Sequence, residues 1–137
     1  MDKTRVLVID DEPIVCKRLK LTLEKMGFEV ETFIDSVKAL ERLKEVDFDI
    51  IVTDLKMEVI DGIQILETAK QKNPKTEVII ISGFATSEAT KEALKKKTLD
   101  FIAKPFCLED LCNIIHYAGN GKKNKTAKRY LKSLAWS

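Results

Sequence analysis

The sequence of 137 residues predicts an α/β protein in which a parallel five-stranded sheet lies between two layers of helices. Two observations lead to this prediction. Short apolar runs alternate along the chain with amphipathic segments of helical period. Several of these runs contain no polar residue, which is typical of strands that are buried on both faces. Right-handed crossovers between parallel strands then leave few topologies open.

The strands are expected where apolar runs stop at polar residues. In chain order, the predicted strands cover residues 6–9, 28–33, 49–54, 78–81 and 99–103. The second run alternates apolar and polar residues, which favours an edge strand with one solvated face. The third run is unbroken and ends at a single carboxylate, Asp54, so we expect it at the centre of the sheet.

Helix boundaries follow from residues that start or stop helices. Pro13 suits the first turn of the first helix, and Gly27 can end it. Either Asp35 or Ser36 can cap the second helix, in which Val37 is expected to face inward.

The last three helices are predicted in the same way. Gly62 opens the third helix, and Asn73-Pro74 ends it. Thr86 or Ser87 caps the fourth helix, and the fifth begins near Leu108.

Charge is unevenly distributed along the chain. The net charge is +2, but the 18 bases and 22 acids of residues 1–117 give −4, and six bases without an acid follow. The last segment also places Ala127, Tyr130, Leu131 and Leu134 on one helical stripe. We therefore expect a domain at residues 1–118 and a basic amphipathic tail or linker helix at 119–137. The tail can dock on its own domain, pair with a copy, bind a partner, lie on an acidic surface or serve as a solvated linker, and these alternatives stay open.

Cysteine usage and hydropathy indicate a cytoplasmic protein. Cys16, Cys107 and Cys112 show neither an even count nor a C-x-x-C spacing, which argues against a disulfide scaffold and a zinc site. The chain shows no secretory signal and no run that approaches the ~20 apolar residues of a membrane span. The acidic body argues against nucleic-acid binding through this domain, and the tail carries no recognisable DNA-binding motif.

Polar residues with useful chemistry follow four of the predicted strands. Asp10 and Asp11 follow the first, Asp54 ends the third, Ser82 follows the fourth, and Lys104 follows the fifth. Because the carboxyl ends of parallel strands lie on one edge, we expect these side chains to share one site. Clustered carboxylates suit Mg²⁺, Lys104 adds a fixed positive charge, and Ser82 can donate a hydrogen bond. Asp54 then has the carboxylate that can form an acyl phosphate.

Five separated segments agree in order and spacing with those of a known family. They are Val8-Ile9-Asp10-Asp11-Glu12, Ile51-Val52-Thr53-Asp54-Leu55, Met57 with Asp61-Gly62, Ser82-Gly83, and Asp100-Phe101-Ile102-Ala103-Lys104-Pro105-Phe106. On these motifs, residues 3–117 resemble a CheY-like receiver domain of response regulators. The resemblance implies a flavodoxin-like, doubly wound (βα)5 fold with strand order 2-1-3-4-5.

The resemblance also implies a function, namely that of a phosphorylation-dependent switch in a two-component phosphorelay. A sensor histidine kinase or a histidine phosphotransfer protein would donate a phosphoryl group to Asp54. Mg²⁺ would be held by Asp11, Asp54 and the backbone carbonyl of Lys56, with Asp10 acting largely through water. Such a protein is not a turnover enzyme, because it catalyses only its own phosphorylation and dephosphorylation.

The same resemblance assigns the response to phosphorylation. Lys104 and Ser82 would contact the phosphoryl group, and Phe101 would rotate inward behind Ser82. A downstream protein or output domain would read the change on the face formed by the fourth helix, the fifth strand and the fifth helix. A homodimer is a further possible assembly.

Two alternatives compete with this interpretation. The first is an aspartate-nucleophile phosphatase or phosphotransferase. Those enzymes commonly carry a second acid two residues after the nucleophile, where this chain has Lys56. The second is a binding module that is never phosphorylated, against which the complete set of polar strand ends argues. The chain also departs from the family pattern at Glu58, where proline is usual, and at Lys97-Thr98, where Gly-Ala is common.

Overall fold

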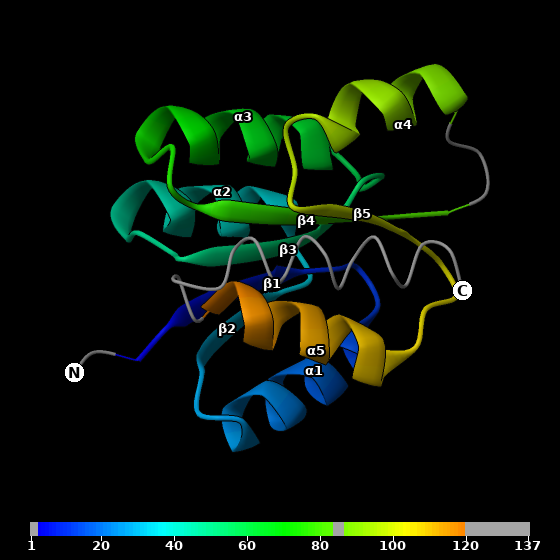
Figure 1. Cartoon of the computed structure of the whole chain (residues 1–137). Coiled ribbons are helices and arrows are strands. Elements are labelled where there is room, and N and C mark those ends of the chain that lie inside the picture. Colours follow the sequence, from blue (N-terminus) through cyan, green and yellow to red (C-terminus); the bar gives the residue numbers. More distant parts are fainter. Residues whose placement is uncertain (1–2, 84–86, 120–137) are drawn as a thin grey trace.

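The computed structural model of the chain describes residues 3–83 and 87–119, and the predicted tail lies outside them. Ten elements alternate along these residues (Figure 1). They are β1 (Arg5–Ile9), α1 (Pro13–Lys25), β2 (Glu29–Phe33), α2 (Ser36–Glu45), β3 (Ile50–Asp54), α3 (Gly62–Lys72), β4 (Glu77–Ser82), α4 (Glu88–Lys95), β5 (Asp100–Ala103) and α5 (Leu108–Gly119).

The predicted sheet and its strand order are confirmed. The five strands pair in the order β2-β1-β3-β4-β5, and every pairing is parallel. The central strand β3 is buried along its whole length. All strands therefore point their carboxyl ends to the same edge of the sheet, at the right of Figure 1.

Helices cover both faces of the sheet, as Figure 1 shows. Helices α1 and α5 lie on one face, and α2, α3 and α4 lie on the other. Successive residues of each buried strand alternate between two cores, so Val6 and Val8 pack toward α1 and α5, whereas Leu7 and Ile9 pack toward α2 and α3. This alternation explains why the runs are apolar without a break.

The structure shows which of the predicted capping residues cap each helix. Asp35 caps α2 by accepting a 2.9 Å hydrogen bond from the Val37 backbone N–H. Ser87 caps α4, whereas Thr86 lies outside the described residues. Helix α1 ends at Lys25, Met26 is its C-cap, and Gly27 follows with the left-handed φ of 99° that glycine tolerates.

Two apolar residues near helix starts do not face the core. Ile14 of α1 is 56% exposed, and Val37, which we expected to face inward, is 36% exposed. Each precedes a fully buried residue of its helix, Cys16 or Ala39, by two positions. Two positions correspond to about 200° of rotation around a helix, so burying one residue turns the other to solvent.

The turn before β5 does not use the left-handed glycine that the family pattern supplies. Helix α4 ends at Lys95, and its C-cap Lys96 has a right-handed conformation. The Lys97 backbone N–H donates to the Leu94 carbonyl at 3.0 Å. The Thr98 hydroxyl donates to the same carbonyl at 2.9 Å. The Thr98 hydroxyl therefore satisfies a carbonyl at the end of α4, as backbone N–H groups of a glycine cap do in other helices.

The edge strand β2 carries charged side chains that pair with neighbouring elements. Arg42 of α2 lies 2.7 Å from Glu31, and Arg5 lies 3.4 Å from Glu31 and 3.7 Å from Glu29. The hydrogen bond from Arg42 lowers the pKa of Glu31, although partial burial opposes that shift. The face of β2 that α2 covers therefore carries paired charges.

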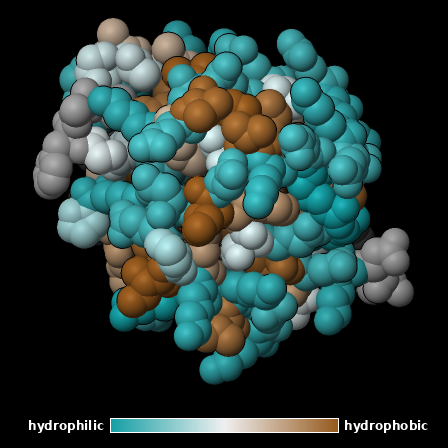
Figure 2. All heavy atoms as spheres, turned by 180° about the vertical axis from the view of Figure 1, so that it is seen from behind, coloured by the Kyte–Doolittle hydropathy of each residue, from teal (hydrophilic) through white to brown (hydrophobic). Residues whose placement is uncertain are grey.

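The surface opposite to the view of Figure 1 is mainly hydrophilic, with separated apolar patches (Figure 2). The large exposed apolar residues of the described chain are Ile14, Leu21, Met26, Ile34, Val37 and Val59. No helix within residues 3–83 and 87–119 is long and apolar enough to cross a membrane.

Gly62 permits a close approach of α3 to the end of β3. A Cβ atom at this position would lie 2.6 Å from the Asp54 carbonyl oxygen and 2.9 Å from the Leu55 Cα. We expect Gly62→Ala to lower the free energy of unfolding by about 2 kcal/mol, because backbone atoms must shift to admit the methyl group. Gly83→Ala is the matched control, since its Cβ would meet nothing within 4 Å. Urea denaturation of both variants checks this, and equal losses would contradict it.

Candidate functional site

The carboxyl edge of the sheet brings together residues that lie up to 94 positions apart. Asp10 directly follows β1, Asp54 ends β3, and Lys104 directly follows β5. The Lys104 amine lies 3.2 Å from Asp10 Oδ2 and 3.1 Å from Asp54 Oδ2. The expected convergence of strand ends is therefore observed for these three side chains.

Lys104 contacts three acids at this edge of the sheet. Besides Asp10 and Asp54, it donates a 2.9 Å hydrogen bond to Glu12 Oε1. Burial alone would lower the pKa of Lys104. The hydrogen bonds to Glu12 and Asp54, with the negative charge of Asp10, outweigh burial and raise that pKa well above its ordinary value. The amine therefore stays protonated and acts as a fixed cation.

The two aspartates are buried and differ from ordinary surface acids. Asp10 is 1% exposed and Asp54 is 7% exposed. Burial raises the pKa of both, although Lys104 and backbone hydrogen bonds from Glu12 and Lys56 oppose the shift. The charge of Asp54 also raises the pKa of Asp10, and the charge of Asp11 raises the pKa of Asp54. A further cation at this edge would stabilise the charged forms.

The residues present fit a divalent hard cation. Oxygen atoms of Asp10, Asp11 and Glu12 lie within 4.8 Å of one another. Asp10 Oδ2 is buried and accepts no hydrogen bond in the described structure, although Lys104 lies close to it. Carboxylate oxygens are the ligands that Mg²⁺ and Ca²⁺ take in proteins. Asp54 faces the same edge, and Lys56 lies two residues beyond it in an exposed loop.

Ser82 and Phe101 lie where the sequence placed them. Ser82 ends β4 and is completely buried, and its hydroxyl has no hydrogen-bond partner among the described residues. Its carbonyl accepts a 2.7 Å hydrogen bond from the Lys104 backbone, which joins β4 to the start of the Lys104 loop. Phe101 is half-buried and packs against the core under α2, α3 and α4. Their roles in a switch remain predictions.

Two residues of the site were not singled out from the sequence. Glu12 contacts Lys104, and the acidic run that contains it was the only signal. Ser36 was considered only as a helix cap. Its buried hydroxyl donates at 2.8 Å to the Glu58 carbonyl and accepts at 3.3 Å from the Ile60 N–H. Ser36 thereby fixes the loop between β3 and α3. No local sequence pattern predicts a contact between residues 22 positions apart.

The left-handed residue of that loop lies between the two atoms that Ser36 binds. Val59 has a φ of 70°, which is uncommon for a β-branched residue, and it is 83% exposed. The Ile60 N–H also donates to the Glu58 carbonyl at 2.8 Å, which closes a tight turn. The hydrogen bonds of Ser36 therefore hold a turn that the sequence alone disfavours.

Burial of the Asp10 charge makes stability depend on pH. The folded-state pKa of Asp10 is raised above 3.8, its ordinary value. The free-energy cost of burying the Asp10 charge is therefore fully present at neutral pH. This cost decreases as pH falls through the folded-state pKa of Asp10. We expect Asp10→Asn, in chelator, to raise the free energy of unfolding at neutral pH, because burial outweighs the favourable contacts of the Asp10 charge.

Urea denaturation across a pH series checks this expectation. The difference between Asp10→Asn and the parent chain should shrink steadily toward pH 3.8. Asp47→Asn is the control, because the Asp47 side chain is 66% exposed beside Lys72. A destabilised Asp10→Asn at neutral pH would show that the Lys104 contact outweighs burial.

Comparison with known proteins places the described domain among similar sequences and structures. The model of the response regulator receiver domain matches residues 6–116. The response regulator receiver protein CpdR of Brucella abortus is 32% identical over 111 residues, which are 81% of this chain and 92% of CpdR. The crystal structure of a response regulator receiver domain protein from Clostridium thermocellum is 34% identical, with a TM-score of 0.76 over 88% of this chain and 97% of that one.

Longer regulators share the same region. The transcriptional regulatory protein ZraR of Escherichia coli is 34% identical over 110 residues, which are 80% of this chain and 25% of ZraR. The chain thus spans about a quarter of the length of the first curated relatives it matches. The matched region contains every strand end of the site described above.

Proposed function

The chain belongs to the family of response regulator receiver domains of two-component systems, and from this premise we propose that Asp54 accepts a phosphoryl group from a phosphohistidine. The donor is a sensor histidine kinase or a histidine phosphotransfer protein. The observation that carries the proposal is the contact between Lys104 and Asp54, 3.1 Å apart at the carboxyl edge and 50 residues apart in the chain.

The transfer needs an attacking carboxylate and neutralised charge. An Asp54 carboxylate oxygen forms the new bond to phosphorus as the phosphorus–nitrogen bond breaks, and the electron pair stays on the imidazole, which takes up a proton. Lys104 stays charged throughout and offsets the repulsion between Asp54 and the phosphoryl oxygens. Mg²⁺, when bound by Asp10, Asp11, Asp54 and the backbone carbonyl of Lys56, supplies further charge neutralisation. Attack by water on phosphorus later restores Asp54.

The switch follows from the buried hydroxyl of Ser82. A fully buried hydroxyl without a partner is costly, and a phosphoryl oxygen on Asp54 offers it an acceptor. We propose that Ser82 moves to donate to that oxygen and that Phe101, on the neighbouring strand, turns inward behind it. Such a movement changes the surface formed by α4, β5 and α5, which an output domain or a downstream protein reads.

The domain organisation that we propose is the one expected from the sequence. Residues 1–118 form the receiver, and residues 119–137 form a separate tail segment, although α5 itself extends to Gly119. The three cysteines of the described residues are free thiols, which suits a reducing cytoplasm. Nucleic acid is not a partner of this domain in our proposal.

Incubation with acetyl phosphate and Mg²⁺, followed by intact mass measurement, tests the function. We expect a single phosphoryl adduct that forms with Mg²⁺ and fails to form in EDTA. Steady release of phosphate from varied phosphomonoesters would instead indicate an aspartate-nucleophile phosphatase. No adduct with any divalent metal would indicate a binding module that is not phosphorylated.

A further inference from the structure

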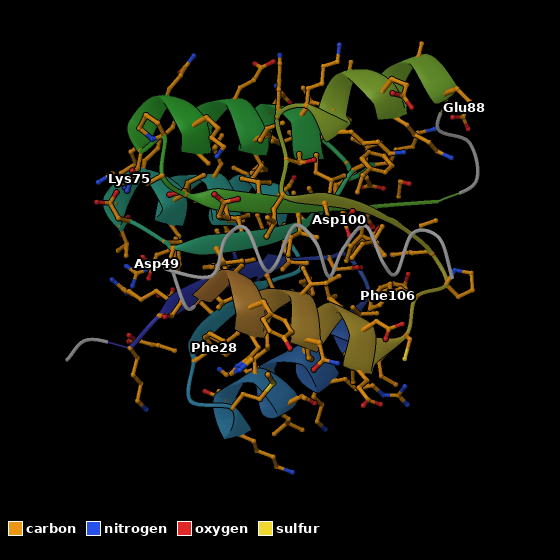
Figure 3. The ribbon with its side chains drawn as sticks, in the orientation of Figure 1. Phe28, Asp49, Lys75, Glu88, Asp100 and Phe106 are labelled. Carbon is orange, nitrogen blue, oxygen red and sulfur yellow. The ribbon has the colours of Figure 1, made fainter. Side chains whose placement is uncertain are left out.

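A groove runs between the edge strand β5 and helix α5. Its floor and walls include Asp100, Phe101, Ile102, Phe106, Asp110 and Ile114. Phe101, Ile102 and Phe106 are only half-buried, so apolar surface faces the groove. Asp100 and Phe106 mark two points along it in Figure 3. Within the described residues, β5 pairs with β4 alone, so its other side borders this groove.

The groove combines apolar surface with negative charge. Asp100 and Asp110 line it together with the aromatic and aliphatic residues, and no basic residue is among its lining residues. Asp110 is exposed, and the carboxylate of Asp100 accepts a 2.7 Å hydrogen bond from the Phe101 N–H. An amphipathic segment with basic flanks would match this surface.

The chain itself continues with such a segment. Helix α5 starts just after the carboxyl end of β5 and ends at Gly119, whose carbonyl lies 3.4 Å from the Thr4 hydroxyl beside the start of β1. The remaining chain therefore begins at the amino edge of the sheet, at the end of the groove where β5 starts. Two glycines, Gly119 and Gly121, can reverse the direction of the chain, and a segment that ran back along α5 from there would reach Phe106.

The tail segment matches the groove in length and in charge. A helix of 14 residues is about 21 Å long, and the 12 residues of α5 span about 18 Å. The tail carries six bases and no acid, and its apolar residues recur at helical spacing. We propose that residues 122–135 dock as an amphipathic helix in the β5–α5 groove of their own chain. Tyr130, Leu131 and Leu134 cover the apolar surface, and the basic side chains lie near Asp100 and Asp110.

The occupant is the chain's own tail rather than a second copy. A linker of a few residues gives a tethered segment an effective concentration on the order of millimolar. One short helix in one groove also buries less than the ~1,200 Å² that stable association between proteins usually needs. The docked tail covers part of the surface on which we place the output, so a partner must displace it.

Hydrogen exchange of the full chain, without phosphodonor or metal, tests the proposal. Leu131→Asp places a charge in the apolar stripe, and Ser133→Asp adds the same carboxylate two positions away, on the opposite side of the helix. We expect Leu131→Asp to accelerate exchange of residues 100–114 about tenfold, which corresponds to a loss of about 1.4 kcal/mol. Ser133→Asp should leave exchange within about twofold of the parent chain, and both variants should keep the exchange of β1 and β3.

Two outcomes would overturn the proposal. Equal exchange of residues 100–114 in both variants would show that the tail does not cover the groove. Protection that increases with protein concentration would assign the groove to a second copy. Phosphorylation of Asp54 does not enter this experiment, so its result stands apart from that of the phosphodonor test.

Discussion

Asp54→Asn should abolish the phosphoryl adduct completely while leaving the fold intact. The amide has nearly the shape of the carboxylate but lacks the charge and the nucleophilic oxygen pair that form an acyl phosphate. Burial disfavours the charged form of Asp54, so removing that charge does not weaken the domain. Intact mass after incubation with acetyl phosphate and Mg²⁺ measures the effect, and circular dichroism checks the fold.

Asp49→Asn is the matched control for that experiment. Asp49 immediately precedes β3, at the opposite end of the strand that Asp54 ends, and Figure 3 shows it far from Phe106 and the carboxyl edge. Its carboxylate accepts a 2.8 Å hydrogen bond from the Arg5 N–H, which the amide oxygen of asparagine can still accept. The control should form the adduct at the parental rate. An adduct retained in Asp54→Asn and lost on substituting another acid would assign the nucleophile elsewhere.

Lys104→Met should lower the free energy of unfolding by about 3 kcal/mol at neutral pH in the absence of metal. Methionine keeps much of the side-chain volume but leaves the buried carboxylates of Asp10 and Asp54 without their cation. The Lys104 side chain is 22% exposed, so the loss should lie at the lower end of the range for buried pairs. Adding Mg²⁺ should restore part of the stability, because a second cation replaces the lost charge.

A double-mutant cycle shows whether the loss comes from those charges. Combining Lys104→Met with Asp10→Asn removes both charges of this contact. We therefore expect the double variant to be more stable than Lys104→Met alone. Lys95→Met is the surface control, since Lys95 is 55% exposed and lies 4.0 Å from Glu92. It should change stability by less than about 0.5 kcal/mol. A loss in Lys104→Met that neither Mg²⁺ nor Asp10→Asn relieves would point to lost packing instead.

Most of the fold and the centre of the site could be predicted because their signals are local. An unbroken apolar run such as residues 78–81 can bury both faces only inside a covered sheet, which the structure confirms. Once the strands are parallel, their carboxyl ends must meet, so Asp10, Asp54 and Lys104 come together without any knowledge of the intervening loops.

Contacts between loops could not be predicted in this way. Ser36 carries the same local signal as any residue near a helix start, yet its hydroxyl binds the loop that follows β3. The Glu12 side chain stays 54% exposed, and only the position of Lys104 gives it a partner. The outward turn of Ile14 and Val37 likewise depends on which neighbour, Cys16 or Ala39, the sheet accepts. Such choices depend on tertiary packing, which residue spacing does not encode.

The paired charges along β2 also limit how this protein can assemble. An exposed sheet edge offers unpaired backbone groups onto which another chain could add a strand, which is how ordered aggregates begin. Here an incoming strand would bring its own side chains beside the ion pair of Glu31 and Arg42 and would remove water from that pair. Extension of the sheet from one molecule to the next through this edge is therefore disfavoured.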